Sequence, residues 1–538
     1  MRKIDLEERI EKLTRIGIAL SSERNLTKLL EMIVDSAREF TNADAGTLYI
    51  VQPEEKNLKW EIIHNDTLKS RQGGTTGIPI TLPPVPLIRD GQPNYTNVSA
   101  YVANTGQAVN IPDVYEAEGF DFTGPRRYDA MTGYRSKSMF VLPMRNHEDD
   151  IIGVLQLLNA KDPDNGDVIA FATELEDLAT ALASQAAVAI TNVRLIHELQ
   201  DLFDAFIRSI ATAIDEKSRY TGGHIRRVAE LTTEIAKAVD HINYGSYADV
   251  HFTPDQMDEI RIAAWMHDVG KVTTPEFVVD KAKKLETIFD RVDLVKTRYE
   301  TIKESLRREA LEKKLDLLSQ GIDDPQRLQV IDDELSQKLA ESDEELQFIV
   351  ATNTGGEFMD DAKIERLKTI AAKTYRVDGE EKPYLMEDEV YNLSIRKGTL
   401  NAEERQKMND HATMTIKMLS QLPFPKKLRH VPEYAGAHHE QLNGKGYPLG
   451  LTAEQIPLPG RIMAIADIFE ALTASDRPYK KPMLLSLSVK ILKSMVSEGH
   501  IDGDVVDIFL KEGIFMDYAK RELKPVQLDE VQITPPSS

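Results

Sequence analysis

The sequence predicts a multidomain protein: an α+β domain near the N-terminus, a long coiled-coil helix, and an all-α C-terminal region that holds a helical insert. Three patterns lead to this prediction. Helix-like and strand-like segments alternate up to about residue 160, apolar residues then recur at steps of three and four, and histidines and aspartates gather on helical segments of the C-terminal half. The 538 residues are enough for about three domains, each with its own core.

The composition excludes several classes of partner and site. The chain has 66 Lys and Arg against 88 Asp and Glu, a formal net charge of −22. Because nucleic-acid affinity comes mainly from Lys and Arg that neutralise phosphates, we expect no nucleic-acid polymer as a partner. Cysteine is absent, so disulfides, thiolate zinc sites, iron–sulfur clusters and a Cys nucleophile are excluded. Any metal must therefore be held by His and carboxylates.

The N-terminal segment 1–24 is predicted to be a charged helix without the apolar core of a secretory signal. Even the most apolar stretch, 179–195, is interrupted by polar residues at helical spacing. We therefore expect a cytoplasmic protein with no membrane partner.

The region 25–165 predicts the α+β domain. An amphipathic helix is followed by a strand that starts at Ala45, and the apolar runs 138–145 and 151–160 have strand length. The stretches YVANTGQAVNIPDVY, SKSMFVLPM and GVLQLLNAKD, in this order, resemble a GAF domain. The resemblance implies a sensory and dimerising module that can bind a small molecule. Asn159, Lys161 and Phe171 match the motif of cyclic-nucleotide-binding members only loosely, so a dimerisation domain without a ligand is the alternative, and any GAF ligand is unknown.

Apolar residues between Leu175 and Ile214 form a seam that only Gln200 interrupts. The seam consists of Leu175, Ala179, Leu182, Ala186, Ala189, Val193, Ile196, Phe203, Ile207, Ile210 and Ile214. Such a heptad pattern predicts a coiled coil, and its 40 residues make a rod of roughly 60 Å. We place the connecting helix at 166–214 and expect a parallel homodimer through the GAF-like domain and this helix. One helix packed on its own domain is the alternative.

The C-terminal region is expected to span 205–499, with a helical insert at 283–390 and a terminal segment and tail at 500–538. In the insert, apolar residues again step by three and four, and SQGIDDPQ predicts a turn between two helices. Its charged residues are most simply solvated helix faces.

Five of the 12 histidines and two aspartates stand in ligand-like settings on helical segments. They are His224, His267, Asp268, His411, His438, His439 and Asp467. This set of His and carboxylate ligands suits a pair of divalent first-row ions. Adjacent His267 and Asp268 can offer an imidazole to one metal and a carboxylate that bridges two, and Lys271 lies on the same helix face as both.

The motifs around these residues resemble the HD superfamily of metal-dependent phosphohydrolases. HHEQLNGKGYP and ADIFEALTASDRPYKK narrow the resemblance to the HD-GYP subfamily of bacterial cyclic di-GMP phosphodiesterases. It implies two metal ions per chain, Fe or Mn, held by the seven residues with Asp268 as the bridge. It also implies that Lys271 contacts the scissile phosphate and that Arg477 and Lys480 hold the other phosphate. The loop of Gly446, Tyr447 and Pro448 would shape the guanine side of the site.

A pair of metal ions about 3.5 to 4 Å apart makes hydroxide available near neutral pH and stabilises the in-line transition state. The expected reaction opens cyclic di-GMP to linear pGpG, with onward hydrolysis to GMP left open. Alternatives are hydrolysis of another cyclic dinucleotide, such as cyclic GMP-AMP, or of a nucleotide phosphate, and a signalling scaffold with weak turnover.

Three departures from the family pattern bear on these expectations. Typical members have Asp where this chain has Asn443, and members with a third metal place Glu where it has Tyr220. The insert also lengthens the connection between His267 and His411. Two metals are therefore expected rather than three, and the scaffold alternative rests on Asn443 and the insert.

Overall fold

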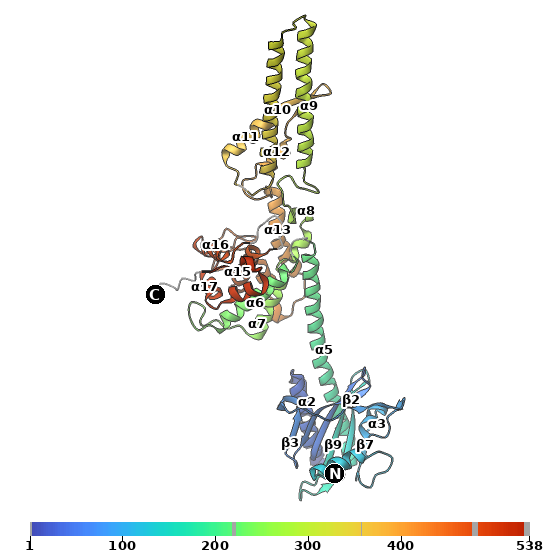
Figure 1. Cartoon of the computed structure of the whole chain (residues 1–538). Coiled ribbons are helices and arrows are strands. Elements are labelled where there is room, and N and C mark those ends of the chain that lie inside the picture. Colours follow the sequence, from blue (N-terminus) through green and yellow to red (C-terminus); the bar gives the residue numbers. More distant parts are fainter. Residues whose placement is uncertain (1–2, 218–221, 357, 476–482, 532–538) are drawn as a thin grey trace. The chain divides into compact units, whose positions relative to one another are not determined.

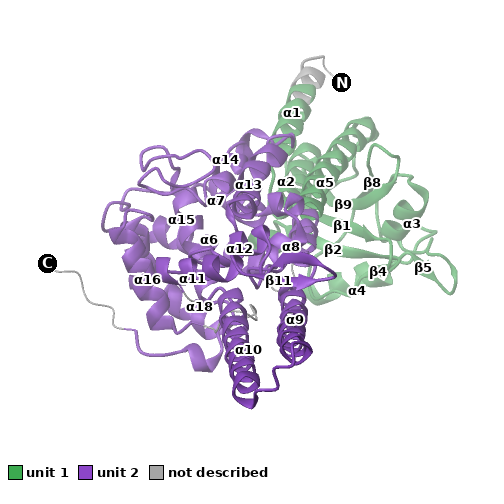
Figure 2. Cartoon of the chain, turned by 90° about the horizontal axis from the view of Figure 1, so that it is seen from above, with its two compact units in different colours: residues 1–203 green, residues 204–538 purple. Residues whose placement is uncertain are grey.

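The computed structural model describes residues 3–217, 222–356, 358–475 and 483–531 (Figure 1). The chain divides into two compact units, 1–203 and 204–538, which Figure 2 shows in green and purple. The helix α5 (Glu176–Asp215) belongs to both units. Three residues of the sequence analysis, Tyr220, Arg477 and Lys480, lie outside the described residues.

The N-terminal unit is built on an antiparallel sheet with the strand order β3-β2-β1-β9-β8-β7. These strands are β1 (Ala43–Gln52), β2 (Asn57–Asn65), β3 (Ser70–Gly73), β7 (Val109–Ile111), β8 (Met139–Arg145) and β9 (Ile151–Lys161). The short strands β4 (Val85–Pro86) and β10 (Val168–Ile169) pair with β2 and β9, and β5 (Ile88–Arg89) pairs with β6 (Gln92–Pro93). Strand and helix together give the α+β architecture that the sequence predicted.

Side chains alternate between the two faces of this sheet, as the period of a strand requires. Leu48 and Phe140 pack on one face with α1 (Lys3–Ser22), α2 (Leu26–Thr41) and the first half of α5. Their sequence neighbours Tyr49 and Val141 pack on the other face, where α3 (Val98–Thr105) contributes Val98 and Val102. The helix α4 (Thr123–Thr132) and the turn η1 (Gly74–Thr76) lie in the connections.

The first half of α5 is part of this core, and this corrects the expected seam. Its apolar positions up to residue 193 are buried against α1, α2 and the sheet: Leu175, Ala179, Leu182, Ala186, Ala189 and Val193. Since their own domain already covers these side chains, they cannot face a second chain. For this stretch the intermolecular seam is wrong, and the alternative of a helix packed on its own domain holds.

Segment 173–215, which contains α5, is also long and apolar enough to cross a membrane by length and composition alone. In the structure, 44% of its most apolar window is buried inside the protein. The apolar character of this window therefore has a partial explanation in the core of the N-terminal unit.

The C-terminal unit is all-α outside the insert in the part that the structure describes. Its helices are α6 (His224–His241), α7 (Pro254–Met266), α8 (Glu276–Val279), α13 (Ala402–Leu419), α14 (Val431–Gly436), α15 (Leu458–Thr473), α16 (Leu485–Ser497), α17 (Gly503–Lys511) and α18 (Ile514–Glu522), with the 3₁₀ turns η3 (Val269–Thr273) and η4 (Lys426–Leu428). The core packs α6, α15, α16, α17 and α18 around Phe469 and Phe509.

The insert has a core of its own. Helices α9 (Val292–Ser319) and α10 (Pro325–Asn353) lie side by side as the predicted hairpin (Figure 1). The helices α11 (Asp361–Ala371) and α12 (Glu387–Leu393) follow, together with the strands β11 (Thr374–Val377) and β12 (Glu380–Pro383). This strand pair was not predicted. Asp378 and Gly379 connect it with φ of 51° and 82°, the left-handed conformation that a two-residue hairpin turn requires.

Two buried lysines hold the two ends of the insert next to the start of α13. Lys281 pairs with Glu404 at 2.7 Å, and both side chains are buried. Lys284 Nζ donates to the carbonyl oxygens of Leu393 and Ile395 at 3.0 and 2.8 Å. Glu404 also accepts from the backbone N–H of Asn401 and so caps α13, the helix that carries His411. The two ends of the insert therefore meet at the start of α13.

Candidate metal centre

Asp268 lies at the middle of the site and is buried. Its Oδ2 is 3.3 Å from His267 Nε2 and 3.4 Å from His224 Nε2, and its Oδ1 is 3.4 Å from His411 Nε2. Lys271 Nζ donates to Oδ2 at 2.6 Å. Burial opposes the charge of Asp268, but Lys271 and His267 outweigh it and hold the pKa of this carboxyl well below its usual value. An ionised carboxylate thus faces three imidazoles.

Two of these histidines are brought together by a close contact between η3 and α13. A Cβ on Gly270 would lie 1.9 Å from the carbonyl oxygen of His411, so only glycine permits this approach. Thr415 Oγ1 accepts from the backbone N–H of Gly270 at 3.0 Å and donates to the carbonyl oxygen of His267 at 2.9 Å. The His267 and His411 segments are therefore fixed against each other by backbone contact and one hydroxyl.

Three of the imidazoles share one hydrogen-bond pattern. The Nδ1 atoms of His267, His411 and His438 contact the carbonyl oxygens of the residues three positions earlier, at 2.7, 2.5 and 2.6 Å. Because a carbonyl only accepts, each Nδ1 carries the proton and each Nε2 keeps its lone pair. Within the described residues, all three Nε2 atoms are buried without a hydrogen-bond partner.

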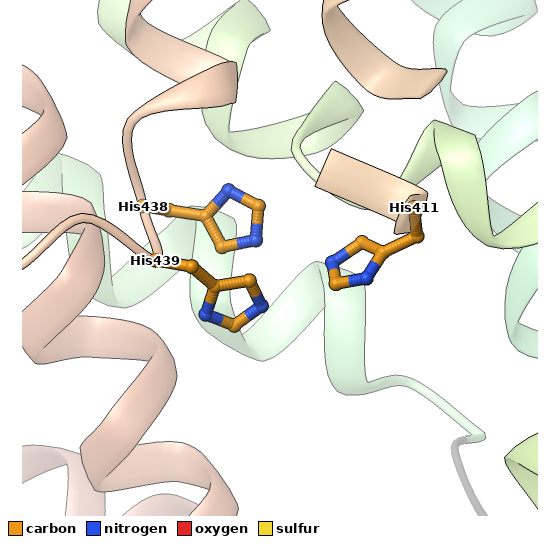
Figure 3. Close-up of side chains that lie close together, drawn as sticks. All are labelled: His411, His438 and His439. Atoms are coloured by element: carbon orange, nitrogen blue, oxygen red, sulfur yellow. The ribbon is translucent and has the colours of Figure 1, made fainter. Parts of the chain in front are cut away.

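His438 and His439 are consecutive residues shortly after the end of α14. Figure 3 shows that both of their rings face His411, which belongs to α13. The potential ligand atoms of these three residues lie within 4.8 Å of one another, and so do those of His224, His267 and Asp268. Burial is the main cause that lowers the pKa of His438 well below its usual value and that of His439 to about 3. These histidines are therefore neutral, as metal ligands must be.

His224 connects the site to α15. Its Nδ1 donates to Glu470 Oε2 at 2.6 Å, and its Nε2 lies 3.4 Å from both Asp268 and Asp467. Burial opposes the charge of His224, but the carboxylates of Glu470 and Asp268 outweigh it and raise its pKa to about 10. His224 Nε2 therefore faces two carboxylates, whose negative charge favours a cation at this position.

Sequence reasoning missed Glu470, although it stands within the stretch that carries Asp467. Burial opposes its charge, but His224 and Arg227 outweigh this and lower the pKa of Glu470 to about 2. Arg227 Nε donates to its second oxygen at 2.8 Å. A fixed carboxylate on the far nitrogen of a histidine sets the tautomer and orientation of a metal ligand. Its spacing of three residues from Asp467, which puts both on one helix face, was the available signal.

A small cavity of about 20 Å³ adjoins the centre and is lined in part by Asp215, His224, Asp268 and Lys271. Burial is the main cause that raises the pKa of Asp215 to about 6. No sequence motif marks Asp215, which is the last residue of α5 and follows a long apolar pattern.

The loop of Gly446, Tyr447 and Pro448 folds back over His439. The rings of Tyr447 and His439 lie 4.7 Å apart between centroids, at an angle of 34°. A Cβ on Gly446 would lie 2.3 Å from the backbone nitrogen of Gln441, so this turn requires glycine. The loop therefore stands beside the candidate ligands.

Glu440 anchors the end of this loop and was also missed. Its carboxylate accepts from the backbone N–H groups of Leu449 and Leu451 at 2.7 and 2.8 Å. Asn443, by contrast, is exposed, and its side-chain oxygen accepts from the backbone N–H of Lys445 at 3.0 Å. An Asp could accept the same bond, so Asn443 is a turn residue rather than a sign of a lost site.

Taken together, the structure brings all seven candidate ligands into one region and places Lys271 and the Gly446 to Pro448 loop beside them. The predicted phosphate contacts Arg477 and Lys480, and Tyr220, fall outside the described residues. The buried, unpartnered Nε2 atoms and the central carboxylate fit divalent metal ions, because such lone pairs are costly to bury without a partner.

Comparisons with known proteins agree with the division of the chain into an N-terminal and a C-terminal unit. A GAF domain model matches residues 25–190, and HD domain models match residues 221–347 and 385–505. The 3'3'-cGAMP-specific phosphodiesterase 1 of Vibrio cholerae is 42% identical over 114 residues, which are 21% of this chain and 26% of that protein. The cyclic di-GMP phosphodiesterase of Thermotoga maritima is 37% identical over 131 residues, 24% and 35% of the two chains. The chain thus spans only about a third or less of these curated relatives.

Among solved structures, the GAF domain of an Acinetobacter phosphoenolpyruvate-protein phosphotransferase is similar to the N-terminal unit. The match covers 37% of this chain and 99% of that one, with 15% identity and a TM-score of 0.26. By the family models alone, the protein joins an N-terminal GAF domain to HD domains in its C-terminal half.

Proposed function

We propose that the protein is a metal-dependent phosphodiesterase that hydrolyses cyclic di-GMP to linear pGpG under the control of its GAF domain. The observation that carries this proposal is the ionised Asp268 among imidazoles, of which His267, His411 and His438 have Nε2 atoms that are buried without a hydrogen-bond partner among the described residues. The names of the two relatives support a cyclic dinucleotide as the substrate class.

In this proposal two divalent ions, Fe or Mn, are held by His224, His267, Asp268, His411, His438, His439 and Asp467. Bound there, they supply hydroxide near neutral pH and neutralise the phosphodiester. Lys271 holds the scissile phosphate, and Arg477 and Lys480 hold the second phosphate. Because the protein as a whole is acidic, the attraction for the phosphates comes from these nearby cations and not from the net charge. The Tyr447 ring closes the guanine side of the site.

Hydrolysis of 3'3'-cGAMP is a second candidate, because the relative with the higher identity bears that substrate in its name. A third is a scaffold that binds the nucleotide but turns it over slowly. Asn443 no longer favours the scaffold, since its side chain accepts from the backbone N–H of Lys445 as an Asp would.

The test is a turnover assay of Mn- and Fe-loaded protein with cyclic di-GMP, 3'3'-cGAMP and pGpG. We expect cyclic di-GMP hydrolysis that Asp268→Asn lowers by more than about a hundredfold, because the variant weakens a ligand that both ions share. Asp502→Asn, at a buried Asp that pairs with Arg461, serves as the matched control. Elemental analysis should give two ions per chain. Normal turnover of Asp268→Asn, or three ions per chain, would contradict this assignment.

We also propose that the protein is a parallel homodimer through a face of α5 other than the expected seam. Leu195, Leu199 and Leu202 are 50%, 66% and 65% exposed and recur at steps of four and three. Phe206 continues the same series and is 62% exposed. A heptad stripe of exposed leucines on a long helix is most simply covered by its counterpart in a second chain.

Light scattering at micromolar concentration tests the dimer. The parent protein should have twice the mass of one chain, and Leu199→Asp should reduce the measured mass to that of a single chain. Leu311→Asp, at a leucine of the insert that is 60% exposed, should leave the dimer intact. A monomeric parent protein would refute the proposal.

The ligand of the GAF domain stays open. The Asn159 side chain accepts from the Lys137 N–H at 2.7 Å and donates to the carbonyl oxygen of Arg135, and Lys161 pairs with Asp44. These residues of the loosely matched nucleotide motif therefore have structural partners in the domain. The cytoplasmic location stays a prediction of the sequence.

A further inference from the structure

Lys217 stands two residues after the end of α5, and its ammonium group is bound to backbone oxygens. Its Nζ donates to the carbonyl oxygens of Lys271, Val272 and Thr274 at 3.0, 2.5 and 2.7 Å. A lysine ammonium has three N–H donors, so these three hydrogen bonds use all of them. The acceptors belong to the 3₁₀ turn η3 and the residue after it, the segment that carries Lys271.

The sequence explains why this turn takes a donor from another segment. In a 3₁₀ turn each carbonyl accepts from the N–H three residues later, as the carbonyl of Lys271 does from Thr274 at 3.1 Å. For the carbonyl of Val272, the residue three positions later is Pro275, which has no N–H. Lys217 supplies the donor that Pro275 lacks.

Other contacts hold the part of this segment that carries the candidate metal ligands. Thr415 Oγ1 bonds both the carbonyl of His267 and the N–H of Gly270. The part that begins at Lys271 is the one that Lys217 bonds. The loss of the Lys217 ammonium should therefore disturb Lys271 more than the metal ligands.

Lys217 and Lys271 both line the cavity of about 20 Å³ beside the centre, but their ammonium groups have different partners. Lys271 Nζ reaches Asp268 Oδ2 at 2.6 Å, whereas all three donors of Lys217 are used on the backbone. A cavity of this volume holds about one water molecule, so it leaves no room for a phosphate beside Lys217. Lys217 can thus act on the substrate only through the turn that it binds.

We propose that Lys217 is a positioning residue of the phosphodiesterase reaction, which fixes η3 and thereby holds Lys271 against the substrate phosphate. This rests on the proposed function, in which Lys271 contacts the scissile phosphate. A misplacement of about 1 Å in a group that orients the substrate can cost about a hundredfold in rate. Through Lys217, the end of α5 is also joined to this phosphate contact by backbone hydrogen bonds.

Steady-state kinetics of the metal-loaded, full-length protein with cyclic di-GMP test this role. Lys217→Met removes the three donors, and we expect kcat/KM to fall at least about tenfold at the metal content of the parent. Lys217→Arg, whose guanidinium also donates to several carbonyls, should keep kcat/KM within about threefold of the parent. The matched control is Lys284→Met, which removes a lysine that donates to the carbonyls of Leu393 and Ile395 and should leave kcat/KM unchanged.

A double-mutant cycle shows whether Lys217 acts through Lys271. The measured quantity is the affinity of the metal-loaded protein for a phosphorothioate analogue of cyclic di-GMP that resists hydrolysis. Lys217→Met should weaken binding at least about fivefold in the parent, but less than about twofold where Lys271→Met has already removed the second amine. Equal losses in the two backgrounds would mean that Lys217 acts on another group and would overturn the proposal.

Amide hydrogen exchange reports on the turn itself and needs no substrate. The N–H groups of Lys271 and Thr274 donate to the carbonyls of Asp268 and Lys271 and so report whether η3 is closed. In Lys217→Met these two amides should exchange at least about tenfold faster than in the parent, and in Lys284→Met they should not.

Three results would count against the positioning role. Parent-like kcat/KM in Lys217→Met would overturn it, as would a loss of activity that only follows a loss of metal. Unchanged exchange in Lys217→Met would remove its structural basis. If no metal-loaded form of the parent turns over or binds the nucleotide, the proposed function fails, while the exchange experiment still decides whether Lys217 fixes the turn.

Discussion

Two buried polar clusters of the C-terminal unit are satisfied in opposite ways. At the root of the insert, Lys281 pairs with Glu404, and Lys284 donates to two carbonyl oxygens. Around Asp268, three imidazole nitrogens are buried without a hydrogen-bond partner among the described residues. Each such group costs about 1–3 kcal/mol, so several together are maintained only where something else binds them. The first cluster therefore belongs to the architecture, and the second belongs to a ligand.

The strongest test of this contrast is to break the satisfied cluster. Lys281→Met leaves the buried carboxylate of Glu404 without its cation, and we expect the free energy of unfolding to fall by about 3–5 kcal/mol. Urea denaturation measures this, and elemental analysis should still find the parent's metal content. Lys296→Met, which removes an exposed pair with Asp293, should cost less than about 1 kcal/mol. A loss below about 1 kcal/mol for Lys281→Met would contradict the structural role.

A smaller effect is expected for Glu470, the carboxylate that holds the candidate metal ligand His224. Glu470→Gln keeps the size of the side chain but removes the charge that fixes His224, so we expect metal affinity to fall about 10- to 100-fold. Competition with a chelator measures this affinity. The control is Glu389→Gln in the insert, at a buried carboxylate that pairs with Arg298 at 2.6 Å. An equal loss of metal affinity in the control would mean that Glu470 acts only through stability.

The smallest effect concerns the pH dependence of stability. Burial lowers the pKa of Lys284 from 10.5 to about 8, so the unfolded chain binds this proton more tightly than the folded one. Stability linked to Lys284 therefore rises with pH between about 8 and 10.5, with a slope of at most about 1.4 kcal/mol per pH unit. Denaturation at a series of pH values should show this slope in the parent and in Lys296→Met, and its loss in Lys284→Met. If the parent and Lys284→Met show the same dependence of stability on pH in this range, the effect is excluded.

The sequence predicted the gathering of the seven candidate ligands because five of them are histidines, of which the chain has only 12, and all seven stand in short motifs. Glu470 and Glu440 stand in the same motifs and were missed. The spacing of three residues puts Glu470 on the helix face of Asp467, but solvated helix glutamates show the same spacing, so it does not identify the role of Glu470, and no spacing marks Glu440. Only the fold, which brings α6 to α15 and the loop to Glu440, reveals these roles.

Apolar periodicity predicted the helix α5 but not what covers it. A step of three and four residues is the same for a helix packed on its own sheet and for one packed on a second chain. The seam from Leu175 to Val193 belongs to the first kind, whereas Leu195, Leu199 and Leu202 are left exposed. In the insert, the Asp378–Gly379 pair was a direct hairpin signal, overlooked because the flanking strands are short and charged.

The contact of Gly270 with the carbonyl of His411 has a consequence for how such a protein can change over evolution. The two backbones touch without a side chain between them, so the separation of His267 and His411 depends on contact and not on the length of chain that joins them. The entropy of closing a longer connection grows only slowly with its length. A whole subdomain can thus be gained, exchanged or lost at this point in a lineage while the geometry of the centre is inherited unchanged.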